Sequence, residues 1–180
     1  MRIIEKLSGH LAEFMPEETI FLCENRMLGR RILAEAAKER LLIGVRAETP
    51  LSLALEVCSS HLEQENGWTY IGRNEAVEVM FDVLQKYQNA VFFAGATAKS
   101  LAAAEKLYDA FHEMEMADIS ELQEKGKQAE LQELRELYQQ EKQEKKFLDR
   151  ADLFRYAIKW IADHNGKQKK VHYLTLGSFH

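Results

Sequence analysis

The stretch that decides the fold runs from residue 19 to residue 62 and reads TIFLCENRMLGRRILAEAAKERLLIGVRAETPLSLALEVCSSHL. It contains two apolar runs of strand length, 19–24 and 41–47, and each leads directly into a segment whose apolar residues recur at helical spacing. Strand, helix, strand, helix in short succession predicts a parallel sheet with crossover helices. The expected buried positions are Leu28, Ile32 and Ala36 in the first helix and Leu51, Ala54, Leu55, Cys58 and Leu62 in the second.

Two helix starts are marked by capping residues. Thr49 is a natural N-cap, and Pro50 stands at the first helical position, where its missing N–H is not needed. Asp149 can cap a helix that begins at Arg150, and Asp152 then lies in the first turn, where the helix dipole favours an acid. The two aspartates could instead form a catalytic pair, but capping is the favoured interpretation.

From about residue 72 to residue 163 the pattern is helix after helix. The segment 121–146 is dense in Glu, Gln and Lys, and its apolar positions end before 139-QQEKQEKK-146, which predicts a solvated, projecting helix. A third apolar run, 171–177, predicts a strand that returns to the sheet. We therefore expect strand–helix units over 1–71, a helical block over 72–165 and a returning strand within 166–180. The apolar stripes expected in the block are Val77, Met80, Phe81, Leu84 and Tyr87; Leu101, Ala104, Tyr108 and Phe111; and Phe154, Ala157, Ile158 and Ile161.

Composition narrows the functional classes. The 180 residues are 46% hydrophobic and 29% charged, as in a folded soluble domain, and no apolar run approaches the length of a membrane span. The net charge of -5 argues against a general polyanion binder but permits a local basic groove. Cys23 and Cys58 match no metal or redox spacing, which predicts reduced thiols in a cytoplasmic protein. No metal-ligand spacing, nucleophile elbow or phosphate-binding loop occurs, so we expect neither a cofactor nor catalytic residues in this chain.

Three segments together resemble the N-terminal region of the AddB/RexB-type subunit of bacterial helicase–nucleases, a relative of UvrD-like helicases that carries a PD-(D/E)xK nuclease. TIFLCENRMLGRRILAEAA resembles the second conserved strand–helix of that motor fold, with Asn25, Arg26, Arg30 and Arg31 in matching places and Glu24 in place of the usual hydroxyl residue. LLIGVRAETPLSLALEV resembles the next strand and helix, and FLDRADLFRYAIKWIADHNGKQKKVHYLTLGSFH resembles the segment that ends in the Walker B strand. The stretch AAAEKLYDAFHEMEMA resembles part of the family's helical insertion.

The departures from the family pattern concern its ATP site. Gly177 and Ser178 stand where the Walker B acids would lie, His180 stands where a Gln would follow, and no Walker A lysine loop precedes residue 18. Without that lysine and those acids, a motor fold lacks the groups that stabilise phosphoryl transfer. The resemblance thus implies a helix-rich α/β fold, with a partial RecA/UvrD-like parallel sheet and a large helical insertion, that does not hydrolyse ATP. It also implies that the chain is a fragment of a longer exodeoxyribonuclease/helicase subunit.

The function implied by the resemblance is that of a scaffold in DNA repair and recombination at double-strand breaks. It would contact single-stranded DNA and an AddA/RexA-type helicase–nuclease subunit in the cytoplasm, away from membranes. The loops after its strands would face the nucleic acid, with Asn25, Arg26, Arg30, Arg46 and Thr49 donating to phosphate oxygens. Arg30 is equally well explained as an ordinary surface residue of a helix. The alternative function is a stand-alone protein–protein interaction module that binds no nucleic acid, which the acidic net charge favours.

Overall fold

The computed structural model describes residues 18–39, 41–88, 91–95, 97–119, 126–164 and 171–175. The chain divides into two compact units. The sheet unit comprises Met1–Val57 and Lys159–His180, and the helical unit comprises Cys58–Ile158.

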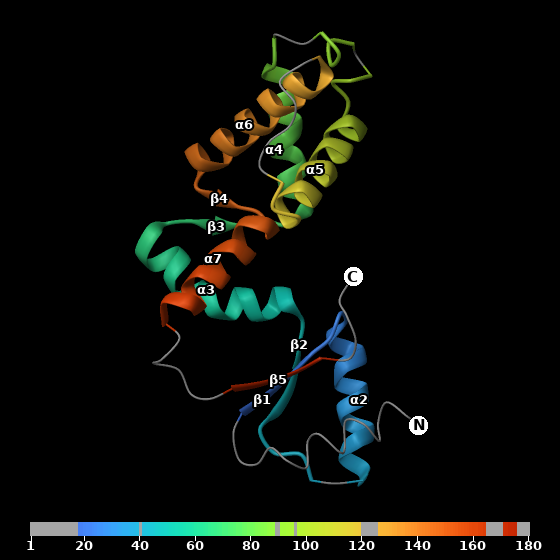
Figure 1. Cartoon of the computed structure of the whole chain (residues 1–180), viewed down its shortest axis with the longest axis vertical. Helices are drawn as coiled ribbons and strands as arrows, with labels where there is room; N and C mark the ends of the chain where they lie inside the picture. The colour runs from blue at the N-terminus through green and yellow to red at the C-terminus, as the bar shows by residue number, and fades with distance from the viewer. Residues whose placement is uncertain are drawn as a thin grey trace. The chain divides into compact units, whose positions relative to one another are not determined.

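The sheet unit contains three parallel strands: β1 (Glu18–Leu22), β2 (Val45–Glu48) and β5 (Val171–Thr175), in the order β2-β1-β5 (Figure 1). Ile20 of β1 pairs with Arg46 of β2 on one side and with Tyr173 of β5 on the other. All three predicted strands are present and parallel, although β2 begins at Val45 and not at residue 41, and the helix-rich α/β class is confirmed. Gly177, Ser178 and His180, the positions compared with the Walker B acids and Gln, lie outside the described residues.

Helix α2 (Arg26–Glu39) packs against this sheet through a narrow face that includes Gly29, Leu33 and Ala36. A Cβ added at Gly29 would lie 2.4 Å from Cys23 Sγ and 2.9 Å from Ala47 Cβ, so only glycine allows the helix to approach this closely. The prediction that Leu28 would be buried is wrong, because this side chain is 55% exposed. The close approach at Gly29 turns the neighbouring Leu28 away from the sheet.

Helix α3 (Pro50–Asn66) begins where the sequence predicted. The backbone N–H of Ser52 donates to Thr49 Oγ1 at 3.1 Å, which is an N-cap hydrogen bond. Ala54, Cys58 and Leu62 are buried, as their spacing predicted.

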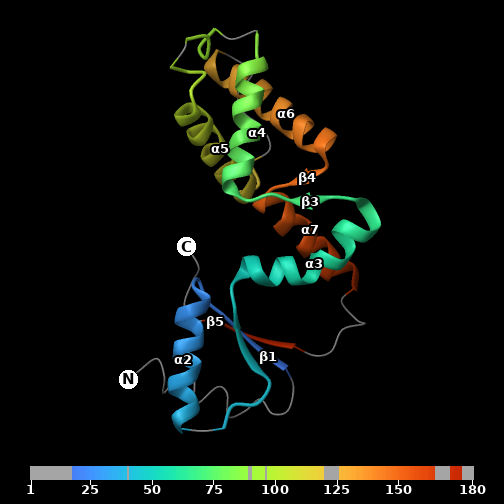
Figure 2. The same cartoon turned by 180° about the vertical axis from the view of Figure 1, so that it is seen from behind.

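The helical unit is built from α4 (Arg73–Lys86), α5 (Leu101–Met116) and α6 (Lys127–Lys145), with α7 (Arg150–His164) following; α5 and α6 both pack against α4 (Figure 2). A short parallel pair, β3 (Thr69–Tyr70) with β4 (Phe147–Leu148), joins residues far apart in the sequence and was not predicted. Two predicted core positions are wrong, since Leu101 is 53% and Ile158 69% exposed. The core of this unit consists of Ile71, Ala76, Val77, Val79, Met80, Val83, Leu84, Tyr87, Ala104, Leu107, Tyr108, Phe111, Leu134 and Tyr138.

The prediction of a solvated, projecting helix over 121–146 is wrong for α6. Leu134 and Tyr138 belong to the core, and Lys142, inside the Glu/Gln/Lys run, is only 2% exposed. The Glu/Gln/Lys run led to a wrong prediction because a charged side chain can be buried when it meets opposite charges on another element. Sequence spacing does not show such contacts. Across the described ranges, no helix combines enough length and apolar character to cross a membrane.

Candidate functional site

The predicted site residues meet at one edge of the sheet unit. Because β1 and β2 are parallel, their carboxyl ends lie side by side, and the N–H of Cys23 donates to the carbonyl of Glu48 at 3.0 Å just beyond both strands. Asn25 and Arg26 follow β1 there, and Thr49 follows β2. The crevice outside the carboxyl ends of parallel strands is the usual ligand-binding place of open α/β sheets.

Glu48 is the centre of this edge. It is 4% exposed, and its Oε1 accepts a hydrogen bond from Arg26 Nη2 at 2.9 Å, while its Oε2 accepts one from Ser52 Oγ at 2.6 Å. Arg46 Nη1 lies 3.6 Å from Glu48 Oε1. The prediction missed Glu48, although an acid that ends a buried strand next to a capping threonine is a signal the sequence contains.

The two arginines keep access to solvent while they are held in place. Arg46 donates to both carboxylate oxygens of Glu56, at 2.5 and 2.9 Å. The Arg46 side chain is 34% exposed and that of Arg26 is 49% exposed. A guanidinium carries five N–H donors, so Arg26, which donates one of them to Glu48, retains donors that face water. The carboxylates thus orient the arginines but also cancel part of their charge.

Asn25 and Thr49 serve mainly as helix caps. Asn25 Oδ1 accepts from the N–H groups of Met27 at 2.9 Å and Leu28 at 3.3 Å, at the start of α2. Thr49 caps α3, and its own hydroxyl donates to Ser52 Oγ at 3.1 Å. Arg30 is exposed on α2, and no ion pair involves it in the described part of the chain. The structure therefore brings Asn25, Arg26, Arg46 and Thr49 to one edge of the sheet. Arg30 lies one helical turn after Arg26. Nucleic-acid binding by these residues stays a prediction.

A second polar cluster is buried in the helical unit, around Lys142 of α6. Its Nζ lies 2.7 Å from Asp149 Oδ2 and 2.5 Å from Asp152 Oδ2, and 4.8 Å from the ring centre of Tyr138. Tyr138 also donates its hydroxyl to Asp149 Oδ2 at 3.0 Å, and Arg155 Nη1 donates to Asp152 at 3.2 Å. Every charge here has an opposite partner, so the cluster ties α6 to α7.

The capping interpretation of Asp149 is confirmed, because its Oδ1 accepts from the N–H groups of Ala151 at 3.0 Å and Asp152 at 3.2 Å. Burial opposes the ionisation of Asp149, but the charge and hydrogen bond of Lys142, together with hydrogen bonds from the Asp152 N–H and Tyr138, hold the pKa of this carboxyl below its usual value. For Asp152, burial raises the pKa by more than the charge of the same lysine lowers it, so the pKa lies above its usual value. A closed cluster with a lysine only 2% exposed has no room for a substrate, so the aspartates are structural.

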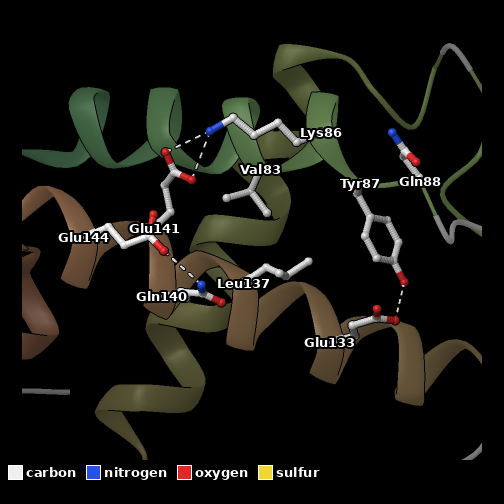
Figure 3. A pocket seen from close by; sticks show the side chains of 9 residues that line it. All are labelled: Val83, Lys86, Tyr87, Gln88, Glu133, Leu137, Gln140, Glu141 and Glu144. Atoms are coloured by element: carbon white, nitrogen blue, oxygen red, sulfur yellow. Dashed lines mark hydrogen bonds and ion pairs between the residues drawn. The ribbon is translucent and has the colours of Figure 1, made fainter.

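A groove of 410 Å³ lies between α4 and α6 (Figure 3). Lys86 Nζ lies 3.0 Å from both carboxylate oxygens of Glu141, and these hydrogen bonds, with those from Lys145, lower the pKa of Glu141. The Tyr87 hydroxyl donates to Glu133 at 2.6 Å. Lys86 with Glu141 and Tyr87 with Glu133 thus join α4 to α6 across this groove.

Among the described residues, no group of three or more His, Cys, Asp or Glu side chains gathers that could hold a metal ion. No protein-family model matches the chain, and no curated protein is significantly similar to it. The arrangement at the carboxyl edge of β1 and β2 is thus the strongest indication of function that the chain offers.

Proposed function

We propose that this chain is a non-catalytic, helicase-like scaffold of a DNA end-processing helicase–nuclease, and that it binds the backbone of single-stranded DNA at the carboxyl edge of β1 and β2. The observation that carries the proposal is the convergence of Arg26 and Arg46 on the buried Glu48 at that edge. The proposal includes a partial RecA/UvrD-like sheet, a helical insertion between β2 and β5, and an AddA/RexA-type partner subunit.

The electrostatics of the edge favour a backbone contact over sequence-specific recognition. Glu48 fixes the Arg26 guanidinium from one side, and the half of the side chain that remains exposed can donate to phosphate oxygens. Arg30, one turn along α2, adds a cation with no described carboxylate partner. Phosphate contacts of this kind position a strand without reading its sequence.

The pairing with Glu48 and Glu56 also limits the strength of binding. Arg26, Arg30 and Arg46 lie at this edge together with Glu48, Glu56 and the exposed Glu24, so little positive charge is left over. Two or three phosphate contacts give a log–log slope of affinity against salt of roughly -1.4 to -2 for a single strand. We therefore expect weak, sequence-tolerant binding that is lost at physiological ionic strength unless a partner subunit adds contacts.

The sheet supports the same proposal. Its three strands are parallel, and the segment compared with the Walker B strand, β5, pairs directly with β1. The chain leaves the sheet after β2 and returns only at β5, with the core of the helical unit in between. This is the order of elements that the resemblance requires.

A protein–protein interaction module is the second candidate, and one loop of the helical unit favours it. Glu130, only 7% exposed, accepts hydrogen bonds from the N–H groups of Val91, Phe92 and Phe93 at 3.2, 2.9 and 3.0 Å. The loop held this way presents Val91, 78% exposed, and Phe92, 55% exposed. Two apolar side chains on a fixed backbone are typical of a protein contact.

The two candidates are separated by fluorescence anisotropy with a labelled oligothymidylate at low salt. We expect the double variant Arg26→Ala/Arg30→Ala to bind more weakly and with a flatter salt dependence than the wild type. The matched control is Arg73→Ala, which removes an exposed arginine of the helical unit that pairs with Asp109 at 2.8 Å. Unchanged binding by the double variant at low salt would refute the DNA site, and no binding by the wild type would leave the interaction module.

A further inference from the structure

Two apolar residues of α2 are left outside the core of the sheet unit. The helix turns Gly29, Leu33 and Ala36 toward the protein, whereas Met27 is 81% and Leu28 55% exposed. Because these two large side chains are exposed, they contribute little to the stability of the fold.

The first turn that carries these residues is held in one conformation. Asn25 Oδ1 accepts the N–H groups of both Met27 and Leu28, so their backbone is capped. Side chains three and four positions apart are neighbours on a helix surface. Met27 is therefore flanked by Arg30 and Arg31, and Arg26 by Arg30. An exposed apolar pair on a fixed turn is bordered on the helix surface by guanidinium groups.

An exposed apolar pair beside arginines fits a ligand that is anionic along one side and flat and apolar along the other. Single-stranded nucleic acid has this character, because its phosphates are accompanied by unstacked bases with free faces. In a duplex the base faces are covered by stacking, and apolar side chains reach them only by inserting between base steps, which costs unstacking energy. Arg30 and Arg31 beside Met27 match a phosphate backbone, and this patch lies at the carboxyl edge of the sheet, whereas Leu41 and Ile43 precede β2 at the opposite edge.

We propose that Met27 and Leu28 contact the bases of a single strand whose phosphates lie on Arg26 and Arg30, and that these contacts make the site prefer single strands over duplex. The inference rests on the proposed DNA binding at the same edge. The arginines contribute salt-dependent affinity that is indifferent to the bases. Met27 and Leu28 contribute a part of the affinity that does not depend on salt and that requires the bases.

The test compares two proteins on two single-stranded probes, with a duplex of the same length as a third probe. Wild type and the double variant Met27→Ala/Leu28→Ala are titrated, at several salt concentrations, with a labelled oligothymidylate and with an abasic oligomer of the same length. Both positions are exposed and alanine favours helix, so the variant is expected to fold as the wild type does. Leu41→Ala/Ile43→Ala serves as the matched control, because it removes two exposed apolar residues of the same unit, which are 71% and 65% exposed.

For the wild type we expect the oligothymidylate to bind about five- to tenfold more tightly than the abasic oligomer, as the loss of a few half-buried methylene contacts would give. The Met27→Ala/Leu28→Ala variant should lose this preference while its salt slope stays that of the wild type, and the control should keep both. A preference that survives in the variant, or equal affinity for a duplex of the same length, overturns the base contact but leaves the backbone site standing. If the wild type binds neither probe even at low salt, the proposed function itself fails, and the base contact with it.

Discussion

Because the charge of Lys142 is buried, we expect its removal to lower the free energy of unfolding strongly. Lys142→Met keeps the aliphatic length of the side chain, and therefore most of its packing, but removes the ammonium that lies between Asp149 and Asp152. Two carboxylates whose side chains are only 5% and 13% exposed then face each other without their shared cation. Breaking a buried pair in this way destabilises much more than forming it stabilises, because the remaining charge cannot be hydrated.

The size of the expected loss in stability depends on the groups that still compensate the two carboxylates after Lys142→Met. Removing one partner of a buried ion pair costs about 3–5 kcal/mol. Arg155, 3.2 Å from Asp152, still compensates one carboxylate, and Tyr138 still donates to Asp149, which places the loss near the low end, about 3 kcal/mol. In a chain of this size such a loss lowers the melting temperature by roughly 10 °C.

The measurement is urea and thermal unfolding followed by the fluorescence of Trp68, in a Trp160→Phe background, because Trp68 lies in the helical unit and the chain has 2 tryptophans. The matched control is Lys145→Met on the same helix. That lysine is 36% exposed and pairs with Glu141 and Asp82, so its loss should cost less than about 1 kcal/mol.

A second substitution tests the cause of the loss. Adding Asp152→Asn to Lys142→Met removes the repulsion between the two buried carboxylates and should recover part of the lost stability. Equal losses for Lys142→Met and Lys145→Met would refute the buried-charge argument. A double variant no more stable than Lys142→Met would show that packing, and not residual charge, is responsible.

Three further predictions concern other parts of the molecule. Gly29→Ala should destabilise by about 1–3 kcal/mol in thermal unfolding despite its gain in helix propensity, because the new Cβ would lie 2.4 Å from a cysteine sulfur, whereas Gly95→Ala, with nothing within 4 Å, should change little. Glu130→Ala should accelerate hydrogen exchange of the 91–93 amides, since it removes the acceptor of all three; unchanged protection would contradict the role of the carboxylate. Burial raises the pKa of Tyr108 to about 12, so its contribution to stability is present below pH 10 and is lost as the pH rises toward 12. Ultraviolet titration of phenolate should show a tyrosine that ionises late and together with unfolding, and a normal, reversible titration of every tyrosine would count against this.

Local patterns in the sequence predicted the local structure well. The alternation of strand and helix over 19–62 and the caps at Thr49 and Asp149 follow from spacing and from hydrogen-bonding groups within a few residues of each other. The parallel pairing of the three strands was inferred from that alternation. The predicted buried face of α2 was wrong at Leu28 because hydrophobicity alone ranks leucine above glycine. The close approach that selects Gly29 depends on Cys23 and Ala47, which lie on other elements.

Long-range partners account for the other differences. The pair β3 and β4 consists of two residues each, too short for a pattern, and exists only because the chain brings Thr69 beside Phe147. The sequence showed Arg26 and Arg46 as candidate phosphate contacts but not their convergence on Glu48, which requires the two parallel strands to end side by side.

The sequence by itself determined where α3 and α7 begin and the class of the fold, because helix capping and apolar spacing depend on interactions between near neighbours along the chain. Only the tertiary structure decided which charges are buried and which remain exposed. Lys142 reads as one more lysine in a polar run, yet it is buried between two aspartates, whereas Met27 and Leu28 read as apolar and yet face water. The physical reason is that the free energy of burying a side chain is set by the groups it meets in space, and those groups come from distant parts of the chain.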